Sequence, residues 1–134
     1  MPETFAPTFA RLRSILEKHS GRWIVGADGP GHYCLDGTPG PAAPRAWGGK
    51  ARRPTIPVAW VRIGKTYVGY HLMGIDGNTK LLALLSKELK GRMQGKTCFN
   101  FRTLDDALFR ELERVTKQAI ADFEKAGFAL RAGS

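Results

Sequence analysis

The sequence predicts an α+β domain: a mainly antiparallel sheet of about five strands, packed against N-terminal, middle and C-terminal helices. Three observations predict it. Apolar residues at helical spacing mark both ends of the chain, strand-like segments come in pairs joined by turns, and a third helical segment precedes the last strand. Paired strands joined by short turns run antiparallel, and the helices would cover one face. The length of 134 residues suits one hydrophobic core, so we expect residues 1–134 to form a single domain.

The N-terminal half is expected to contain a helix, a hairpin and a long loop. An apolar stripe with a period of about 3.6 residues predicts a helix over residues 4–20, and Gly21 would end it. Residues 22–25 and 32–36 are predicted strands, joined by a turn over residues 26–31. A Gly/Pro-rich stretch at about 37–55 predicts a surface loop. The stripe consists of Phe5, Phe9, Leu12 and Leu16.

The second half is expected to contain a hairpin, a helix, a strand and a final helix. Residues 56–63 and 66–73 are the predicted hairpin strands, and Gly64-Lys65 between them suits a two-residue type II′ turn. The remaining expected elements are a helix from Asn78 to about residue 90, a strand at 97–101, and a helix capped by Thr103 and ended by Gly127-Phe128 in a Schellman motif.

The positive charge is concentrated in the middle of the chain. The net charge of +9 arises within residues 40–101, which contain eleven basic side chains and only two acidic ones, Asp76 and Glu88. Both flanking segments are neutral. A localised excess of this kind forms a surface that attracts anions. The basic run Lys87, Lys90, Arg92 and Lys96 is either a solvated face or, together with Lys50, Arg52 and Arg53, a surface for phosphates.

Strand alternation separates a core face from a candidate binding face. Val68, Tyr70 and Leu72 share one face of their strand, and the aliphatic and Phe side chains of the other strands would join them in the core. The opposite face then combines aromatic rings with hydrogen-bond donors, which suits a polar or anionic ligand. The alternatives are an ordinary solvated face or a second helix-covered face in which hydrogen bonds satisfy His71. With Lys96, the candidate ligand-binding residues are Trp60, Arg62, Tyr67, His71, Asn100 and Arg102.

Several common functions are excluded by spacing. Neither Gly-Lys-Thr tripeptide, at 64–66 or 95–97, has the preceding glycine or the following helix of a phosphate loop. Two cysteines, Cys34 and Cys98, are too few for a disulfide scaffold, and no paired metal-ligand motif occurs, so we expect no cofactor. No apolar run could span a bilayer and the N-terminus lacks a secretory pattern; we therefore expect a soluble cytoplasmic protein with no membrane partner.

Two segments carry a family resemblance. The stretch Gly64-Lys-Thr-Tyr-Val-Gly-Tyr-His-Leu-Met73 and the stretch Met93-Gln-Gly-Lys-Thr-Cys-Phe-Asn-Phe101 resemble the bacterial YdhG-like family, which is catalogued as a domain of unknown function. The resemblance covers about residues 5–128 and implies a small α+β sheet domain that is distantly frataxin-like, with one branch linked to intracellular iron handling. It assigns no role to Tyr70, His71, Lys96, Cys98 or Asn100.

These observations lead to three functional hypotheses. The first is a non-enzymatic binding domain for an anionic small molecule or a macromolecule such as nucleic acid. The second is a frataxin-like iron-binding protein, although such sites use exposed carboxylates and the middle of this chain has almost none; calorimetric titration with ferrous iron tests it. The third is a small enzyme in which His71 acts as acid or base beside Cys98 or Asn100.

Overall fold

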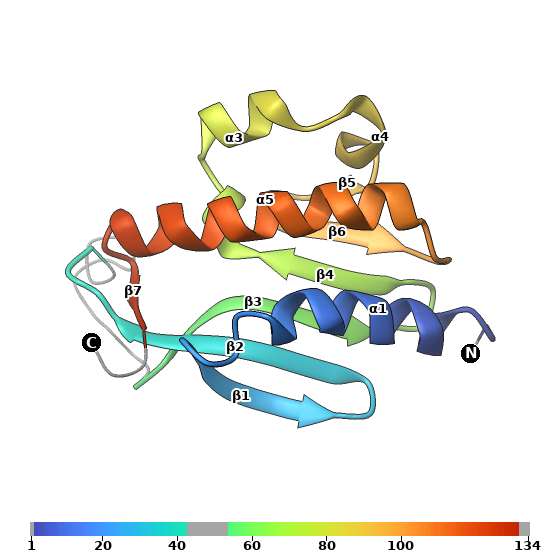
Figure 1. The fold of residues 1–134 in the computed structure, drawn as a ribbon, viewed down its shortest axis with the longest axis horizontal. Coiled ribbons are helices and arrows are strands. Elements are labelled where there is room, and N and C mark those ends of the chain that lie inside the picture. Colours follow the sequence, from blue (N-terminus) through green and yellow to red (C-terminus); the bar gives the residue numbers. More distant parts are fainter. Residues whose placement is uncertain (1, 43–53, 132–134) are drawn as a thin grey trace.

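The computed structural model describes residues 2–42 and 54–131. It confirms the predicted α+β class: helices pack on an antiparallel sheet, which has seven strands in this part of the chain (Figure 1). The helices are α1 (Phe5–Glu17), α3 (Thr79–Leu84), α4 (Lys87–Lys90) and α5 (Asp106–Lys125), with a 3₁₀ turn η1 (Met73–Ile75). The strands are β1 (Ile24–Gly29), β2 (His32–Pro39), β3 (Ile56–Ile63), β4 (Val68–Leu72), β5 (Met93–Gln94), β6 (Cys98–Phe101) and β7 (Ala129–Leu130).

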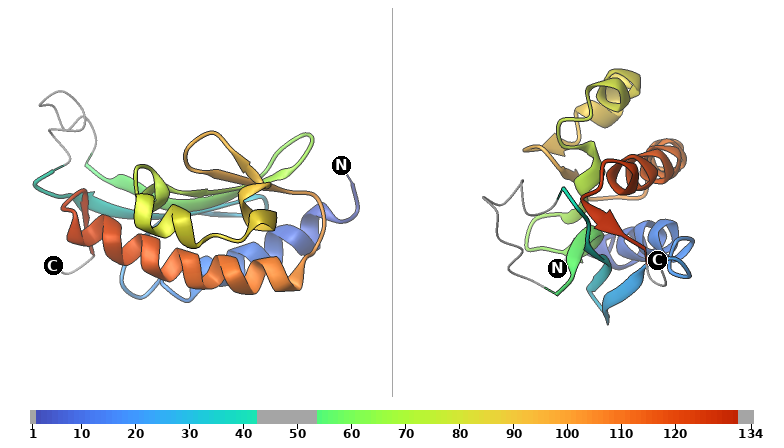
Figure 2. Two further views of the ribbon diagram at one scale, coloured as in Figure 1. Left: turned by 90° about the horizontal axis from the view of Figure 1, so that it is seen from above. Right: turned by 90° about the vertical axis from the view of Figure 1, so that its left-hand side faces the viewer.

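The sheet has the strand order β1-β2-β3-β4-β6-β5, and β7 adds to the end of β2. Helices α1 and α5 lie on the same face of the sheet, whereas the β3–β4 turn and the β5–β6 hairpin rise on the opposite side (Figure 2). The short helices α3 and α4 pack against α5. None of the helices in the described ranges is long and apolar enough to cross a membrane.

The core lies between the sheet and the two long helices, as the apolar patterns predicted. The stripe of α1 is buried, and so are the inward-facing residues of β4 and β6. Tyr70 is fully buried at the centre of the sheet, and its hydroxyl lies 2.6 Å from Thr116 Oγ1 on α5. This hydrogen bond joins the middle strand to the last helix and satisfies both polar groups.

The predicted middle helix is two short helices, so that expectation was wrong. Asn78 caps α3 as expected, because its side-chain oxygen accepts a hydrogen bond from the Leu81 amide at 3.3 Å. The helix then breaks at Leu85, which has an extended backbone, and Ser86 caps α4 by accepting from the Leu89 amide. Leu81, Leu85 and Leu89 are all buried. Glu111 of α5 fixes it by accepting from both the amide and the hydroxyl of Ser86.

The helix ends differ from the predictions at two positions. Helix α1 ends at Glu17, and Gly21 lies beyond it without a left-handed backbone. Helix α5 is capped by Asp105 rather than Thr103, since Asp105 accepts from the Leu108 amide at 3.2 Å. The C-terminal prediction is confirmed. Gly127 has a φ of +85°, and the Phe128 amide donates to the Phe123 carbonyl, as a Schellman motif requires.

The first hairpin is longer than predicted. Strand β1 continues to Gly29, so the turn consists of Pro30-Gly31, and β2 continues to Pro39 into the stretch that was expected to be loop. The two-residue strands β5 and β7 are too short to show an alternating pattern, and the sequence did not predict them. Residues 43–53 of the predicted loop, including its basic residues Arg45, Lys50, Arg52 and Arg53, lie outside the described residues.

The turn between β3 and β4 is displaced by one residue from its predicted position. The Gly64 amide donates to the Tyr67 carbonyl and Ile63 pairs with Val68, so Lys65-Thr66 form the tip and Gly64 lacks the positive φ of a type II′ turn. Both registers bury the same side chains, and apolar alternation could not distinguish them. The observed register pairs Trp60 with His71, whereas the predicted turn would have paired Trp60 with Gly69.

Candidate functional site

A row of side chains crosses the sheet on the face away from α1 and α5. Cys34 pairs with Trp60, Trp60 with His71, and His71 with Cys98, on four adjacent strands. The Trp60 and His71 rings are stacked, with centroids 4.5 Å apart and planes inclined by 8°. Both side chains are half-buried, and a small cysteine lies on either side of the pair. We call this row the aromatic row.

Three different polar atoms converge beside the aromatic row, above Gly69. Cys98 Sγ lies 3.6 Å from His71 Nε2 and 3.1 Å from Asn100 Oδ1. A Cβ atom built on Gly69 would lie 3.3 Å from His71 Nε2 and 3.8 Å from both other atoms, so a glycine here leaves space in the middle of the cluster. The cluster brings together the His71, Cys98 and Asn100 side chains that the enzyme hypothesis required.

The titration behaviour of the cluster favours neutral side chains. Burial lowers the pKa of His71 and raises the pKa of the Cys98 thiol. Folding lowers the His71 pKa, so the folded protein favours the neutral ring. The free energy of unfolding should therefore be highest above the ordinary pKa of histidine and should fall when acid protonates the ring. A neutral thiol beside a neutral imidazole is a hydrogen-bonding pair rather than an activated thiolate.

Cys34, the second cysteine of the aromatic row, is also held in its neutral thiol form. Burial raises the pKa of Cys34 to about 12, assisted by a hydrogen bond to Asp36 and by the charge of that carboxylate. The Cys34 Sγ to Asp36 Oδ1 distance is 3.1 Å. Asp36 lies over β1, where a Cβ on Gly26 would overlap its carboxylate. The Asp36 carboxylate therefore lies towards β1, on the opposite side of the row from the cluster.

A small hollow opens beside the cluster, where the ends of β4, β5 and β6 meet. Its volume is about 350 Å³. Arg102 Nε donates to the Thr66 carbonyl at 2.8 Å, which holds the guanidinium at the rim. Tyr67 is 40 % exposed, and Asn100 joins the hollow to the cluster. The described lining residues, none of them acidic, are Thr66, Tyr67, Gly91, Arg92, Gln94, Asn100 and Arg102.

The structure brings together some of the candidate residues from the sequence and separates others. Tyr67, Asn100 and Arg102 line the hollow, whereas Trp60 and His71 form the aromatic row next to it. Arg62 is exposed on the same face, in the cross-strand row that continues through Gly69 to Asn100. Lys96 is exposed near the tip of the β5–β6 hairpin and does not line the hollow. The seven residues thus belong to one face but not to one cavity.

The sequence analysis did not assign four lining residues of the hollow to a binding site: Thr66, Gly91, Arg92 and Gln94. Arg92 lies just before β5 and Gln94 on it, and this strand is too short to show an alternating pattern. Arg92 was predicted only as part of a basic run, and its partners Lys87 and Lys90 are exposed on α4 instead. The signal available in the sequence was the hairpin glycine Gly95, whose φ of +75° allows β5 to fold back on β6.

The basic side chains of this face lack acidic partners in the described part of the chain. The ion pairs found there involve Arg11, Arg13 and Lys18 at the N-terminal end and Arg110 and Arg131 at the C-terminal end. By contrast, no carboxylate within 4.0 Å is found for Arg62, Arg92 or Arg102 among residues 2–42 and 54–131. Their charge is available to a ligand.

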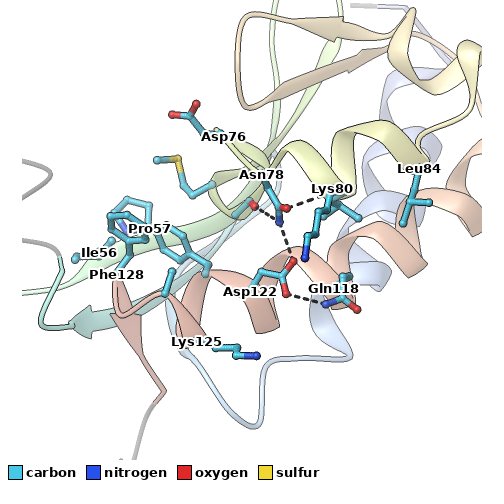
Figure 3. Close-up of a pocket in the computed structure, with 16 residues that line it drawn as sticks. Ile56, Pro57, Asp76, Asn78, Lys80, Leu84, Gln118, Asp122, Lys125 and Phe128 are labelled. Atoms are coloured by element: carbon cyan, nitrogen blue, oxygen red, sulfur yellow. Dashed lines mark hydrogen bonds between the residues drawn. The ribbon is translucent and has the colours of Figure 1, made fainter.

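A larger pocket lies at the other end of the sheet, and the sequence did not predict it. It has a volume of about 940 Å³ and lies between η1, α3 and the C-terminal end of α5 (Figure 3). Its central carboxylate, Asp122, accepts hydrogen bonds from Asn78 Nδ2 at 2.8 Å and Gln118 Nε2 at 2.7 Å. Two lysines, Lys80 and Lys125, are balanced by two carboxylates in its lining, so its charge selects no anion.

Comparison with family models, curated proteins and solved structures found no match to this chain. Membership of the YdhG-like family therefore remains a prediction that rests on the sequence motifs. Among the described residues, no group of three or more His, Cys, Asp or Glu side chains is arranged to hold a metal ion. Iron binding likewise remains a prediction.

Proposed function

We propose that this protein is a binding domain for an anionic ligand, which it holds on the sheet face opposite α1 and α5. The observation that carries the proposal is the 350 Å³ hollow in which Arg92 and Arg102 meet without an acidic neighbour in the described lining. A guanidinium fixed by one hydrogen bond keeps further N–H groups for a phosphate or carboxylate, in the planar geometry that both anions match.

The other residues around the hollow support an anionic ligand of mixed polarity. Asn100 uses its amide oxygen to accept from Cys98, which leaves its NH₂ group for the ligand. The half-exposed Tyr67 ring offers an apolar surface with a hydroxyl at its end. The exposed Lys65 and Lys96 lie in the two hairpins on this side of the sheet and add to its positive potential (Figure 2).

The proposed partner is an anionic small molecule or nucleic acid, and the proposed location is the cytoplasm. Both cysteines of the described chain are free thiols, which suits a compartment that keeps thiols reduced.

Removing the Arg102 guanidinium should weaken anion binding by about tenfold or more. Losing a hydrogen bond to a charged group costs about 1.5–3 kcal/mol, and a tenfold change in affinity is about 1.4 kcal/mol. The measurement is calorimetric titration of the wild type and Arg102→Gln with inorganic tripolyphosphate at 50 and 200 mM salt. Wild-type affinity should also fall at the higher salt concentration.

The control for this measurement is Arg114→Gln, which removes the same charge from an exposed position on α5. It should leave the affinity nearly unchanged, because α5 covers the opposite face of the sheet. Equal losses in the two variants would mean that tripolyphosphate responds only to net charge, and the proposed site would be wrong.

The 3.6 Å contact between Cys98 Sγ and His71 Nε2 makes a second candidate function testable, namely catalysis with His71 as acid or base. If His71 activates the thiol, iodoacetamide should alkylate Cys98 at a rate that follows His71 ionisation, and His71→Gln should slow the reaction. Because burial shifts both pKa values towards the neutral forms, we expect slow alkylation that His71→Gln leaves unchanged. A rate lowered severalfold by His71→Gln, measured by mass spectrometry in a Cys34→Ser background, would favour catalysis instead.

A further inference from the structure

We propose that the anionic ligand is a single-stranded nucleic acid, whose bases stack on the aromatic row while its phosphates meet the arginines of the same face. This inference rests on the anion-binding function proposed above and names its ligand class. The two requirements of single-strand recognition are flat aromatic surfaces for bases and a positive groove for the backbone.

The aromatic row provides the stacking surface. Trp60 and His71 already form a two-ring stack at 4.5 Å, so each ring has one face in contact with its partner and another that faces outward along the row. The neighbours on those outer sides are Cys34 and Cys98, whose side chains are short. A third ring can therefore extend the stack above a cysteine, in the position where a base would continue it. Stacking of this kind accepts any base.

The arginines provide the backbone contacts. Arg62 lies one cross-strand row from the Trp60–His71 stack, and Arg92 and Arg102 lie at the hollow on the far side of Asn100. Positive charge thus lies beside the aromatic row at Arg62 of β3, just before β5 at Arg92 and just after β6 at Arg102. The described strands β3 to β6 carry no carboxylate that would repel a phosphate.

The polar side chains at the hollow could read base edges. Asn100 and Gln94 carry amides, which pair with donor and acceptor groups on bases. A duplex would not use these features, because its bases are stacked inside and it presents only phosphates and groove edges. The two long helices α1 and α5, whose length would suit a groove, lie on the other side of the sheet (Figure 2).

The test is fluorescence anisotropy of a labelled 12-nucleotide oligothymidylate and of a 12-base-pair duplex, with the full-length protein. The single strand should bind more tightly than the duplex although it carries fewer phosphates. Trp60→Ala should weaken single-strand binding about 5- to 150-fold, the range that loss of one stacked base gives. Trp60→Phe, which keeps an aromatic ring, should restore most of the affinity, and thermal melting checks that both variants fold.

The salt dependence distinguishes the contributions of the arginines. For a single strand, each phosphate contact adds about −0.7 to the slope of log affinity against log salt concentration. Arg92→Gln should therefore make the slope shallower by about 0.7, whereas Trp60→Ala should lower the affinity and leave the slope unchanged.

Two negative results of these binding measurements would contradict different proposals. If the duplex binds as tightly as the single strand and Trp60→Ala has wild-type affinity, the nucleic-acid inference is wrong, but tripolyphosphate binding that depends on Arg102 would leave the anion proposal standing. If neither oligonucleotide nor tripolyphosphate binds, both proposals are wrong.

Discussion

Gly74→Ala should destabilise the protein by about 3 kcal/mol, the largest effect that we expect from adding a single methyl group. Gly74 lies in η1, directly against α5, and a Cβ built on it would lie 2.0 Å from the Ala119 carbonyl oxygen and 2.7 Å from its carbon. Those atoms belong to the helix backbone, so no side-chain rotation can relieve the overlap. The substitution must push η1 away from α5 and open the packing between β4 and the last helix.

Urea denaturation followed by circular dichroism measures this prediction. The matched control is Gly21→Ala in the exposed turn after α1, where an added Cβ would meet no atom within 4 Å and the backbone φ is not positive. It should change the free energy of unfolding by no more than about 0.5 kcal/mol. Similar midpoints for the two variants would show that η1 does not pack on α5 as described.

Thr116→Val should cost about 1–3 kcal/mol of unfolding free energy, because it leaves the buried Tyr70 hydroxyl without a partner. The double variant Tyr70→Phe/Thr116→Val should recover most of that loss, since neither polar group then remains to be satisfied. The measurement is a double-mutant cycle by urea denaturation. An additive cycle, in which the double variant is as unstable as the two losses combined, would contradict the hydrogen bond.

Thr8→Val is the internal control for this cycle. Thr8 is also fully buried, on α1, but its Oγ1 has no hydrogen-bond partner among the described residues. Replacing that hydroxyl with a methyl group should therefore be neutral or stabilising. The same chemical change should thus be destabilising at Thr116 and not at Thr8.

The fold could be predicted from the sequence wherever the pattern was long. The stripe of α1, the alternation of β3 and β4, and the Schellman end of α5 at Gly127 each depend on local chemistry that acts within a few residues. The break at Leu85 could not be predicted, because it depends on Glu111 of α5, which accepts from Ser86 across 25 positions of sequence. Strands β5 and β7 each have two residues, and pairing with a distant strand defines them.

The candidate face could be predicted, but its geometry could not. Alternation alone assigned Trp60, His71 and Asn100 to one side of the sheet, and they lie there. The stack of Trp60 on His71 depends on the register of β3 and β4, and apolar alternation is the same in registers that differ by two residues. The hollow depends on Arg92, which the β5–β6 hairpin brings to Arg102.

The most direct test of the anion site is a backbone amide NMR titration of the full-length protein with inorganic tripolyphosphate. Shift changes should concentrate on the β3–β4 turn, on Arg92 to Gln94 and on Asn100 to Arg102, and helices α1 and α5 should stay unperturbed. Changes centred on Asn78 and Asp122 would instead assign the anion to the pocket of Figure 3. That result, or no change anywhere up to millimolar tripolyphosphate, would contradict an anion site on this face of the sheet.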